Sequence, residues 1–123
     1  MDKIIKTALI QMPISSDIEH NKRELSKQIE QAAKQSAQLI VLSELHNTPY
    51  FCQTEDVRNF DLAEAIPGPS TAYYSALAAK YKVVLITSLF ERRAPGLYHN
   101  TAVVFDTDGS IAGKYRKIHL PAH

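Results

Sequence analysis

The sequence has a single cysteine, Cys52, among its 123 residues. One thiol cannot close a disulfide within the chain, so we expect a reducing, cytoplasmic location rather than a secreted disulfide framework. No apolar run is long enough to span a membrane, and no small-residue cleavage site follows the apolar run at the N-terminus. A glycine-rich phosphate loop is absent too, because the motif PGPS at residues 67–70 is typical of a turn and not of a nucleotide site.

Excess charge of either sign is also missing, since the formal net charge is +1 and the isoelectric point about 7.9. This balance predicts no general attraction to nucleic acid or to a membrane surface. The short basic stretch Lys114–His119 lacks the aromatic platform of a nucleic-acid site. The histidines show no metal-ligand spacing, since Pro121 between His119 and His123 argues against one helical face. We therefore predict neither a metal nor a cofactor, and one globular domain over residues 1–123.

The first third of the chain predicts a strand, a helix and a second strand. Residues 4–12 are largely apolar, and Ser16 and Glu19 fit a capping box that opens an amphipathic helix reaching to about residue 35. Residues 39–42 are apolar throughout, as strands covered on both faces tend to be. A right-handed parallel unit is the expected topology.

The rest of the chain predicts a second helix, capped by Ser70, and three further strands. These strands are expected at residues 83–91, 101–105 and 111–118. The stretch 92–96 between the first two is expected to be a loop, and Asp108-Gly109 a tight hairpin turn. Residues 55–64 fit either a loop or a short helix. The sum is an α/β fold with a mixed sheet and two main helices. Because two helices are too few to cover both faces, we expect a larger domain or partner chains to cover the rest.

Glu44 is the first candidate for chemistry, because it follows the predicted strand 39–42 almost at once. Ligands gather at the carboxyl ends of strands in open α/β sheets, and a partly desolvated carboxylate there is a usable general base. The alternative is a carboxylate that caps the next turn or lies in solvent.

Lys117 and Cys52 are the other candidates. Side chains alternate across a sheet, so Lys117 shares a face with Tyr115, and an inward ammonium would need a carboxylate partner such as Glu44. An ammonium beside a reacting carbonyl stabilises its oxyanion. The alternative is a solvated basic edge strand. Cys52 has no basic residue nearby before Arg58, so a small packing thiol is favoured over a nucleophile.

Three stretches, in this order, resemble the carbon–nitrogen hydrolase (nitrilase) superfamily. They are TALIQMP (7–13), LIVLSELHNTPYFCQ (39–53) and LYHNTAVVFDTDGSIAGKYRKIHLP (97–121). The endings YFCQ and KYRKIHLP look most similar to the N-carbamoylputrescine amidase branch, with β-ureidopropionase and ω-amidase-like members as near alternatives. The resemblance implies a partial α-β-β-α sandwich, and makes residues 1–123 the N-terminal part of a single carbon–nitrogen hydrolase domain.

The resemblance also implies a Glu-Lys-Cys mechanism without metal or cofactor. Glu44 is similar to the family's general base and Lys117 to its oxyanion-stabilising lysine. The nucleophilic cysteine is expected beyond this chain, and Cys52 matches a cysteine that is not the nucleophile. Tyr50 and Phe51 are expected to line the substrate pocket. Asn100 resembles a residue that the family keeps near the site and is expected to bind substrate, with a structural side-chain hydrogen bond as the alternative.

The implied function is hydrolysis of a linear amide or N-carbamoyl group, with N-carbamoylputrescine as the expected substrate and ammonia as a product. A homo-oligomer is expected. Two alternatives stay open. One is an inactive fragment that acts as a folding or oligomerisation module, because half a sandwich exposes large apolar faces. The other is a flavodoxin-like binding domain, which fits the α/β order but lacks a phosphate loop.

Overall fold

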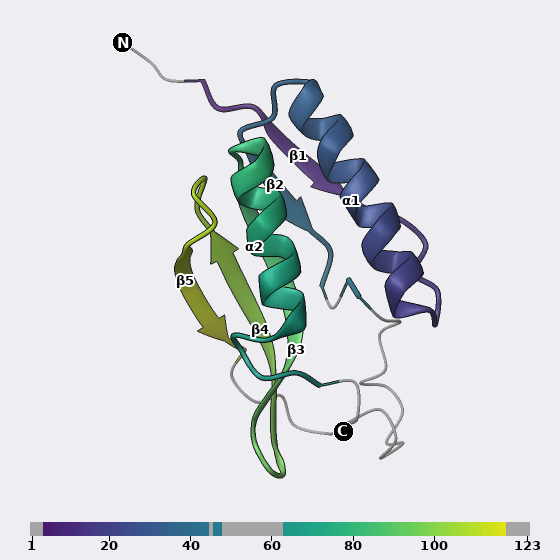
Figure 1. The fold of residues 1–123 in the computed structure, drawn as a ribbon, viewed down its shortest axis with the longest axis vertical. Coiled ribbons are helices and arrows are strands. Elements are labelled where there is room, and N and C mark those ends of the chain that lie inside the picture. The colour runs from purple at the N-terminus through teal and green to yellow at the C-terminus, as the bar shows by residue number, and fades with distance from the viewer. Residues whose placement is uncertain (1–3, 45, 48–62, 118–123) are drawn as a thin grey trace.

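The computed structural model describes residues 4–44, 46–47 and 63–117, which form one mixed sheet and two helices (Figure 1). The elements in chain order are β1 Thr7–Ile10, α1 Ile18–Lys34, β2 Leu39–Leu42, α2 Pro69–Tyr81, β3 Val84–Ala94, β4 Leu97–Phe105 and β5 Ile111–Arg116. The strands lie side by side in sequence order, with β1, β2 and β3 parallel and with β4 and β5 each antiparallel to the strand before. The predicted α/β fold with a mixed sheet is confirmed.

The first strand is shorter than the predicted 4–12. Only Thr7–Ile10 pairs with β2, because β2 itself offers four residues to the ladder. Ile4 and Ile5 precede it with exposed fractions of 91% and 61%. An apolar sequence alone therefore overstated the length of the strand.

Helix α1 covers the predicted residues, but its cap is different from the predicted one. The N-cap is Asp17, whose backbone is extended and whose carboxylate accepts the amide of His20 at 3.2 Å. The predicted cap at Ser16 is wrong by one residue, because Asp17 supplies the acceptor that the first turn needs. Leu25 and Ile29 form the buried stripe of the helix.

Helix α2 begins at Pro69 and is not capped by Ser70, in contrast to the prediction. Proline is well suited to a first helical turn, where its missing N–H would have no partner in any case. The capping interactions come from Thr71, whose hydroxyl oxygen accepts the Gly68 N–H at 2.5 Å. The Ser70 hydroxyl donates instead to Glu64, also at 2.5 Å.

The hairpin of β3 and β4 is longer than predicted and projects beyond the other strands (Figure 1). The predicted loop 92–96 is mostly strand, because β3 continues to Ala94 and Gly96 makes the turn with φ of +76°. Pairing with another segment supports the extension, since the Arg92 N–H donates to the Glu64 carbonyl at 2.7 Å. The turn between β4 and β5 lies where Asp108-Gly109 predicted it, with Gly109 at φ of +86°.

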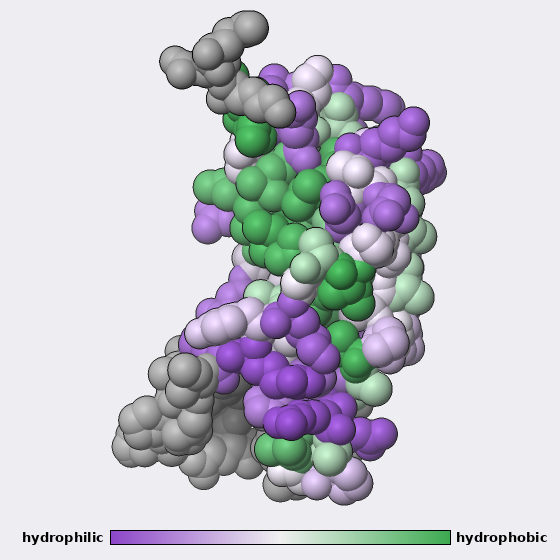
Figure 2. Space-filling model, turned by 90° about the vertical axis from the view of Figure 1, so that its left-hand side faces the viewer, coloured by the Kyte–Doolittle hydropathy of each residue, from purple (hydrophilic) through white to green (hydrophobic). Residues whose placement is uncertain are grey.

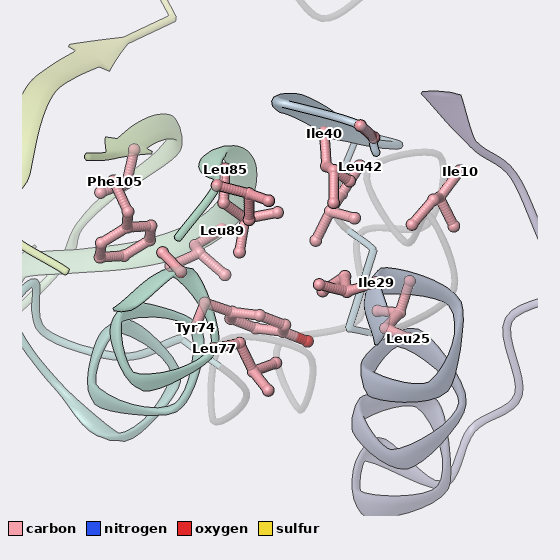
Figure 3. Packing of buried hydrophobic residues seen from close by; sticks show 14 residues of the cluster. Ile10, Leu25, Ile29, Ile40, Leu42, Tyr74, Leu77, Leu85, Leu89 and Phe105 are labelled. Carbon is pink, nitrogen blue, oxygen red and sulfur yellow. The ribbon is translucent and has the colours of Figure 1, made fainter. Parts of the chain in front are cut away.

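Both helices cover the same face of the sheet (Figures 1 and 3). Apolar side chains of the strands point toward the helices and pack against apolar side chains of α1 and α2. The fully or nearly buried members are Ile10, Leu25, Ile29, Ala37, Ile40, Leu42, Tyr74, Leu77, Ala78, Val83, Leu85, Leu89, Val103 and Phe105. This layer forms the core.

The opposite face, which we term the open face, is not covered by any described residue. Leu9 on β1 and Tyr115 on β5 are 75% and 64% exposed there. Figure 2 views the molecule from the side of β5. Apolar residues gather in the upper half of this view, above a band of polar residues. This agrees with the sequence analysis, in which two helices were too few to cover both faces of the sheet.

Candidate active site

The candidate site lies where two strands of the same direction end. Strand β5 is antiparallel to β4, which is antiparallel to β3, so β5 runs in the same direction as β2. Glu44 lies just beyond the end of β2, and Lys117 directly follows β5. The Lys117 Nζ donates to Oε1 of Glu44 at 3.0 Å. The two side chains are 42% and 46% exposed, so the pair is open to a reactant. The predicted meeting of these two groups is therefore present.

Two polar side chains from the intervening strands lie beneath this pair. Asn100 of β4 donates its Nδ2–H to Oε1 of Glu44, the oxygen that Lys117 also contacts. Ser88 of β3 donates its hydroxyl to Oδ1 of Asn100 at 3.0 Å. The backbone N–H of Lys117 donates to the Asn100 carbonyl at 2.9 Å. Asn100 thus contacts both charged residues.

Strand alternation places these groups on the open face. Thr87 and Leu89 of β3, and Thr101 of β4, are buried on the side of the helices. Successive side chains in a strand point to opposite faces. Ser88 and Asn100 therefore belong to the face that the helices do not cover. The pair with Lys117 holds the Glu44 carboxylate over the same polar groups.

The loop that carries Glu44 is anchored on the helical side by Asn47. Tyr74 of α2 donates its hydroxyl to Oδ1 of Asn47 at 2.6 Å, and Asn47 donates to the Ser70 hydroxyl at 2.9 Å. The Asn47 carbonyl accepts from the Nδ2 of Asn21 of α1 at 2.6 Å. Both helices therefore fix the chain three residues after Glu44. The sequence predicts no role for Asn47, and it predicts Ser70 only as a helix cap.

His46 is fully buried in this loop and is not suited to acid–base chemistry. Its ring lies edge-to-face on Tyr74 with centroids 4.9 Å apart, and neither ring nitrogen has a hydrogen-bond partner in the described part of the chain. Burial lowers the pKa of His46 to about 3, and the charge of Lys22 acts in the same direction. The ring is therefore neutral near pH 7 and serves as packing. Burial raises the pKa of the Tyr74 hydroxyl as well.

A second ion pair anchors the end of β5 on the helical side. The Glu91 side chain is 2% exposed, and its carboxylate accepts hydrogen bonds from Nε and Nη2 of Arg116 at 2.8 and 2.9 Å. Thr101 donates to the same carboxylate at 2.8 Å. The guanidinium of Arg116 holds the pKa of the Glu91 carboxyl below its usual value. Because Arg116 directly precedes Lys117, this pair fixes the backbone from which the Lys117 side chain leaves.

The remaining predicted site residues have different outcomes. Tyr50, Phe51 and Cys52 lie outside the described residues, so the pocket lining stays a prediction. The contact seen for Asn100 is with Glu44, and its contact with substrate also stays a prediction. Ser88 was missed, although a polar residue on the apolar strand 83–91 was its signal. The described residues contain no group of three or more histidine, cysteine or acidic side chains that could hold a metal, and none of their helices is long and apolar enough to cross a membrane.

Residues 6–123 match the sequence profile of the carbon–nitrogen hydrolase family. The chain belongs to this family. It is 41% identical to the citrullinase of Francisella tularensis, over 95% of this chain and 41% of that protein. It is 37% identical to the omega-amidase NIT2 of Homo sapiens, over 94% of this chain and 40% of that protein. The crystal structure of a carbon–nitrogen hydrolase from Helicobacter pylori matches with a TM-score of 0.89 at 47% identity, over 95% of this chain and 40% of that one.

These similarities confirm the predicted superfamily and its fold, but not the predicted branch. The N-carbamoylputrescine amidase of Solanum lycopersicum is 30% identical over 98% of this chain and 40% of that protein, which is less than the citrullinase and the omega-amidase. The narrower resemblance is therefore not confirmed. The chain spans about 40% of the length of these relatives.

Proposed function

We propose that this chain supplies two of the three catalytic groups of an amidohydrolase that cleaves a linear amide or N-carbamoyl group and releases ammonia. Glu44 is the general base, and Lys117 stabilises the oxyanion. The observation that carries the proposal is the contact of 3.0 Å between these two half-exposed side chains at one edge of the sheet. Membership of the carbon–nitrogen hydrolase family supports it.

The nucleophile in this proposal is a cysteine thiol contributed from outside residues 1–123. Glu44 takes the thiol proton, and the thiolate attacks the carbonyl carbon of the substrate. The Lys117 ammonium stabilises the negative charge that develops on the carbonyl oxygen. Glu44 then returns the proton to the leaving nitrogen, and ammonia departs. Water, deprotonated by Glu44, attacks the remaining thioester or thiocarbamate and frees the thiol.

The pair of charges makes chemical sense for both halves of this reaction. A base held by two donors keeps one direction for proton transfer. The ammonium of Lys117 lies 3.0 Å from that base, so a carbonyl oxygen beside Lys117 brings its carbon within reach of a thiolate formed beside Glu44. The exposure of the pair leaves room for both reactants.

The proposed substrate class is a small compound with a terminal amide or ureido group. N-Carbamoylputrescine is the substrate expected from the sequence, and the names of the similar citrullinase and omega-amidase add two alternatives. A panel of N-carbamoylputrescine, citrulline and a linear ω-amide, assayed for ammonia release, separates them. Tyr50 and Phe51 are proposed as pocket walls, since they follow Glu44 closely in the sequence.

The proposed roles are tested in the full-length protein with Glu44→Gln and Lys117→Ala. We expect each variant to fold and to lose turnover, because a base and a transition-state contact both act on kcat. Lys114→Ala is the matched control, since Lys114 is also a lysine of β5 but lies on the other face. Near-normal turnover in Glu44→Gln would remove Glu44 from the role. A Lys117→Ala variant that changed only KM would remove the oxyanion assignment.

The open apolar face favours a second candidate function, a folding or oligomerisation module. Leu9 and Tyr115 are largely exposed there, and such surfaces usually mark an interaction site. The first occupant we propose is the rest of the same catalytic domain, and the full-length protein is proposed to form a homo-oligomer. Light scattering and ammonia release, measured on residues 1–123 and on the full-length protein, distinguish the two functions. Ammonia release by the full-length protein alone supports the amidohydrolase, and its absence from both favours the module.

A further inference from the structure

The two oxygens of the Glu44 carboxylate have different surroundings. Oε1 accepts from Nδ2 of Asn100 and from Nζ of Lys117. Oε2 has no hydrogen-bond partner in the described part of the chain. Each donor on Oε1 occupies a lone-pair site of that oxygen and fixes its position. Among the described residues, the carboxylate is therefore anchored through Oε1, and Oε2 accepts no hydrogen bond.

The orientation of the Asn100 amide is set by Ser88. The Ser88 hydroxyl donates to Oδ1 of Asn100 at 3.0 Å, which turns the NH₂ group of the amide toward Glu44. These two contacts distinguish the oxygen of the Asn100 amide from its nitrogen. The oxygen faces the Ser88 hydroxyl, which donates, and the nitrogen faces the Glu44 carboxylate, which accepts. The pairing of β3 with β4 holds Ser88 and Asn100 on the same face.

Asn100 also ties the base to the lysine through its backbone. Its carbonyl accepts a hydrogen bond from the N–H of Lys117 at 2.9 Å. This bond lies next to the paired residues Thr101 of β4 and Arg116 of β5. The same residue therefore fixes the carboxylate by its side chain and the start of Lys117 by its main chain. This arrangement is not expected for a residue whose main task is contact with the substrate.

We propose that Asn100 is a positioning residue that anchors Oε1 of Glu44, so that Oε2 is the oxygen that takes the proton from the attacking thiol. This inference rests on the proposed function. The S–H bond breaks, the proton bonds to Oε2, and the electron pair stays on sulfur and attacks the carbonyl carbon. Oε2 later gives the proton to the departing nitrogen. Ser88 acts through Asn100 by holding its amide.

The test uses Asn100→Leu in the full-length enzyme, which keeps the size of the side chain and removes its donor. We expect kcat to fall roughly 10- to 100-fold, the loss typical of one hydrogen bond to a charged group, with KM changed less than about twofold. The acid limb of the pH profile of kcat/KM moves to higher pH, because the ionised carboxylate loses a donor. Asn100→Asp moves this limb further, since a second negative charge faces the first.

Variants of Ser88 separate positioning from folding. Ser88→Ala is expected to shift the acid limb in the same direction by less, and Ser88→Thr restores it by keeping the hydroxyl. Thr87→Val is the matched control, because Thr87 is the next residue on β3 and donates to the Val103 carbonyl at 2.9 Å on the helical side. Thr87→Val lowers the stability and leaves the pH profile unchanged.

Two results overturn the inference. One is an Asn100→Leu enzyme with a raised KM and an unchanged kcat and pH profile, which assigns Asn100 to substrate binding. The other is a Ser88→Ala profile equal to that of Thr87→Val, which decides the matter even if Asn100→Leu does not fold. Failure of the proposed function is recognised separately, because it requires turnover in Glu44→Gln. A dead Glu44→Gln enzyme with an unshifted Asn100→Leu profile refutes only the positioning role.

Discussion

The pair of Glu91 and Arg116 gives a quantitative prediction about the strand that ends at Lys117. Glu91 is 2% exposed, so Arg116→Met leaves a buried carboxylate whose only side-chain donor among the described residues is the Thr101 hydroxyl. Removing one partner of a buried pair costs about 3–5 kcal/mol. Because Arg116 is 31% exposed and partly screened, we expect a loss below that range, about 2–3 kcal/mol of unfolding free energy.

The double variant Glu91→Leu with Arg116→Met removes both charges together. Replacement of a whole pair by apolar groups is often close to neutral, so we expect a loss of about 1 kcal/mol or less. The single losses therefore do not add, and the coupling is at least about 1 kcal/mol. Urea unfolding of the full-length protein, followed by circular dichroism, measures all four corners of the cycle.

The pH dependence supplies a second signature of the same pair. Arg116 lowers the pKa of the folded Glu91 carboxyl from the ordinary 4.5, so the pair adds stability above that pH and loses it as the pH falls through the lowered value. This acid loss is expected to diminish in Arg116→Met. Additive single losses, or an unchanged acid limb of stability, would refute the assignment of a coupled buried pair.

Three further predictions concern the surroundings of the site. Tyr74→Phe leaves Oδ1 of Asn47 without its donor and should lower both the unfolding free energy, by about 1–2 kcal/mol, and kcat; an unchanged denaturant midpoint would contradict this. The buried His46 has a pKa of about 3, against an ordinary value of 6.5, so the unfolded chain binds the proton at a higher pH than the folded chain does. The unfolding free energy therefore falls below about pH 6.5, by at most about 1.4 kcal/mol per pH unit. The variant His46→Phe should remove this slope when denaturation is measured as a function of pH. Gly109→Ala should lower the melting temperature more than Gly96→Ala, because both glycines have positive φ but a Cβ at Gly109 meets a backbone oxygen of α2 at 2.9 Å; equal losses would show that contact to be unimportant.

The sequence was sufficient for those parts of the fold that depend on local pattern. The apolar run of β2, the spacing of α1 and the Asp108-Gly109 turn each carry a signal that neighbouring residues do not obscure. Strand ends were less accurate, because Ala94 and Leu97 enter their strands through pairing with each other. Such pairing depends on the partner strand and not on the apolar pattern of one segment.

The candidate site was predictable in part for the same reason. Glu44 follows a clear strand, and alternation placed Lys117 on the face of Tyr115, but the contact between them arises from the order of five strands. The Ser88 and Asn100 contacts depend on the register of β3 against β4, which the sequence alone does not give. Resemblance to the family supplied the catalytic roles, and these remain predictions.

The central claim is that Glu44 and Lys117 act as one unit when a thiolate attacks the carbonyl group of the substrate. It is tested most directly by kcat/KM for ammonia release in the full-length enzyme, measured for Glu44→Gln, Lys117→Ala and the double variant. Because groups that act as a unit lose their effects together, we expect the double variant to be about as impaired as either single one. Losses that multiply in the double variant would show two independent roles and contradict the claim.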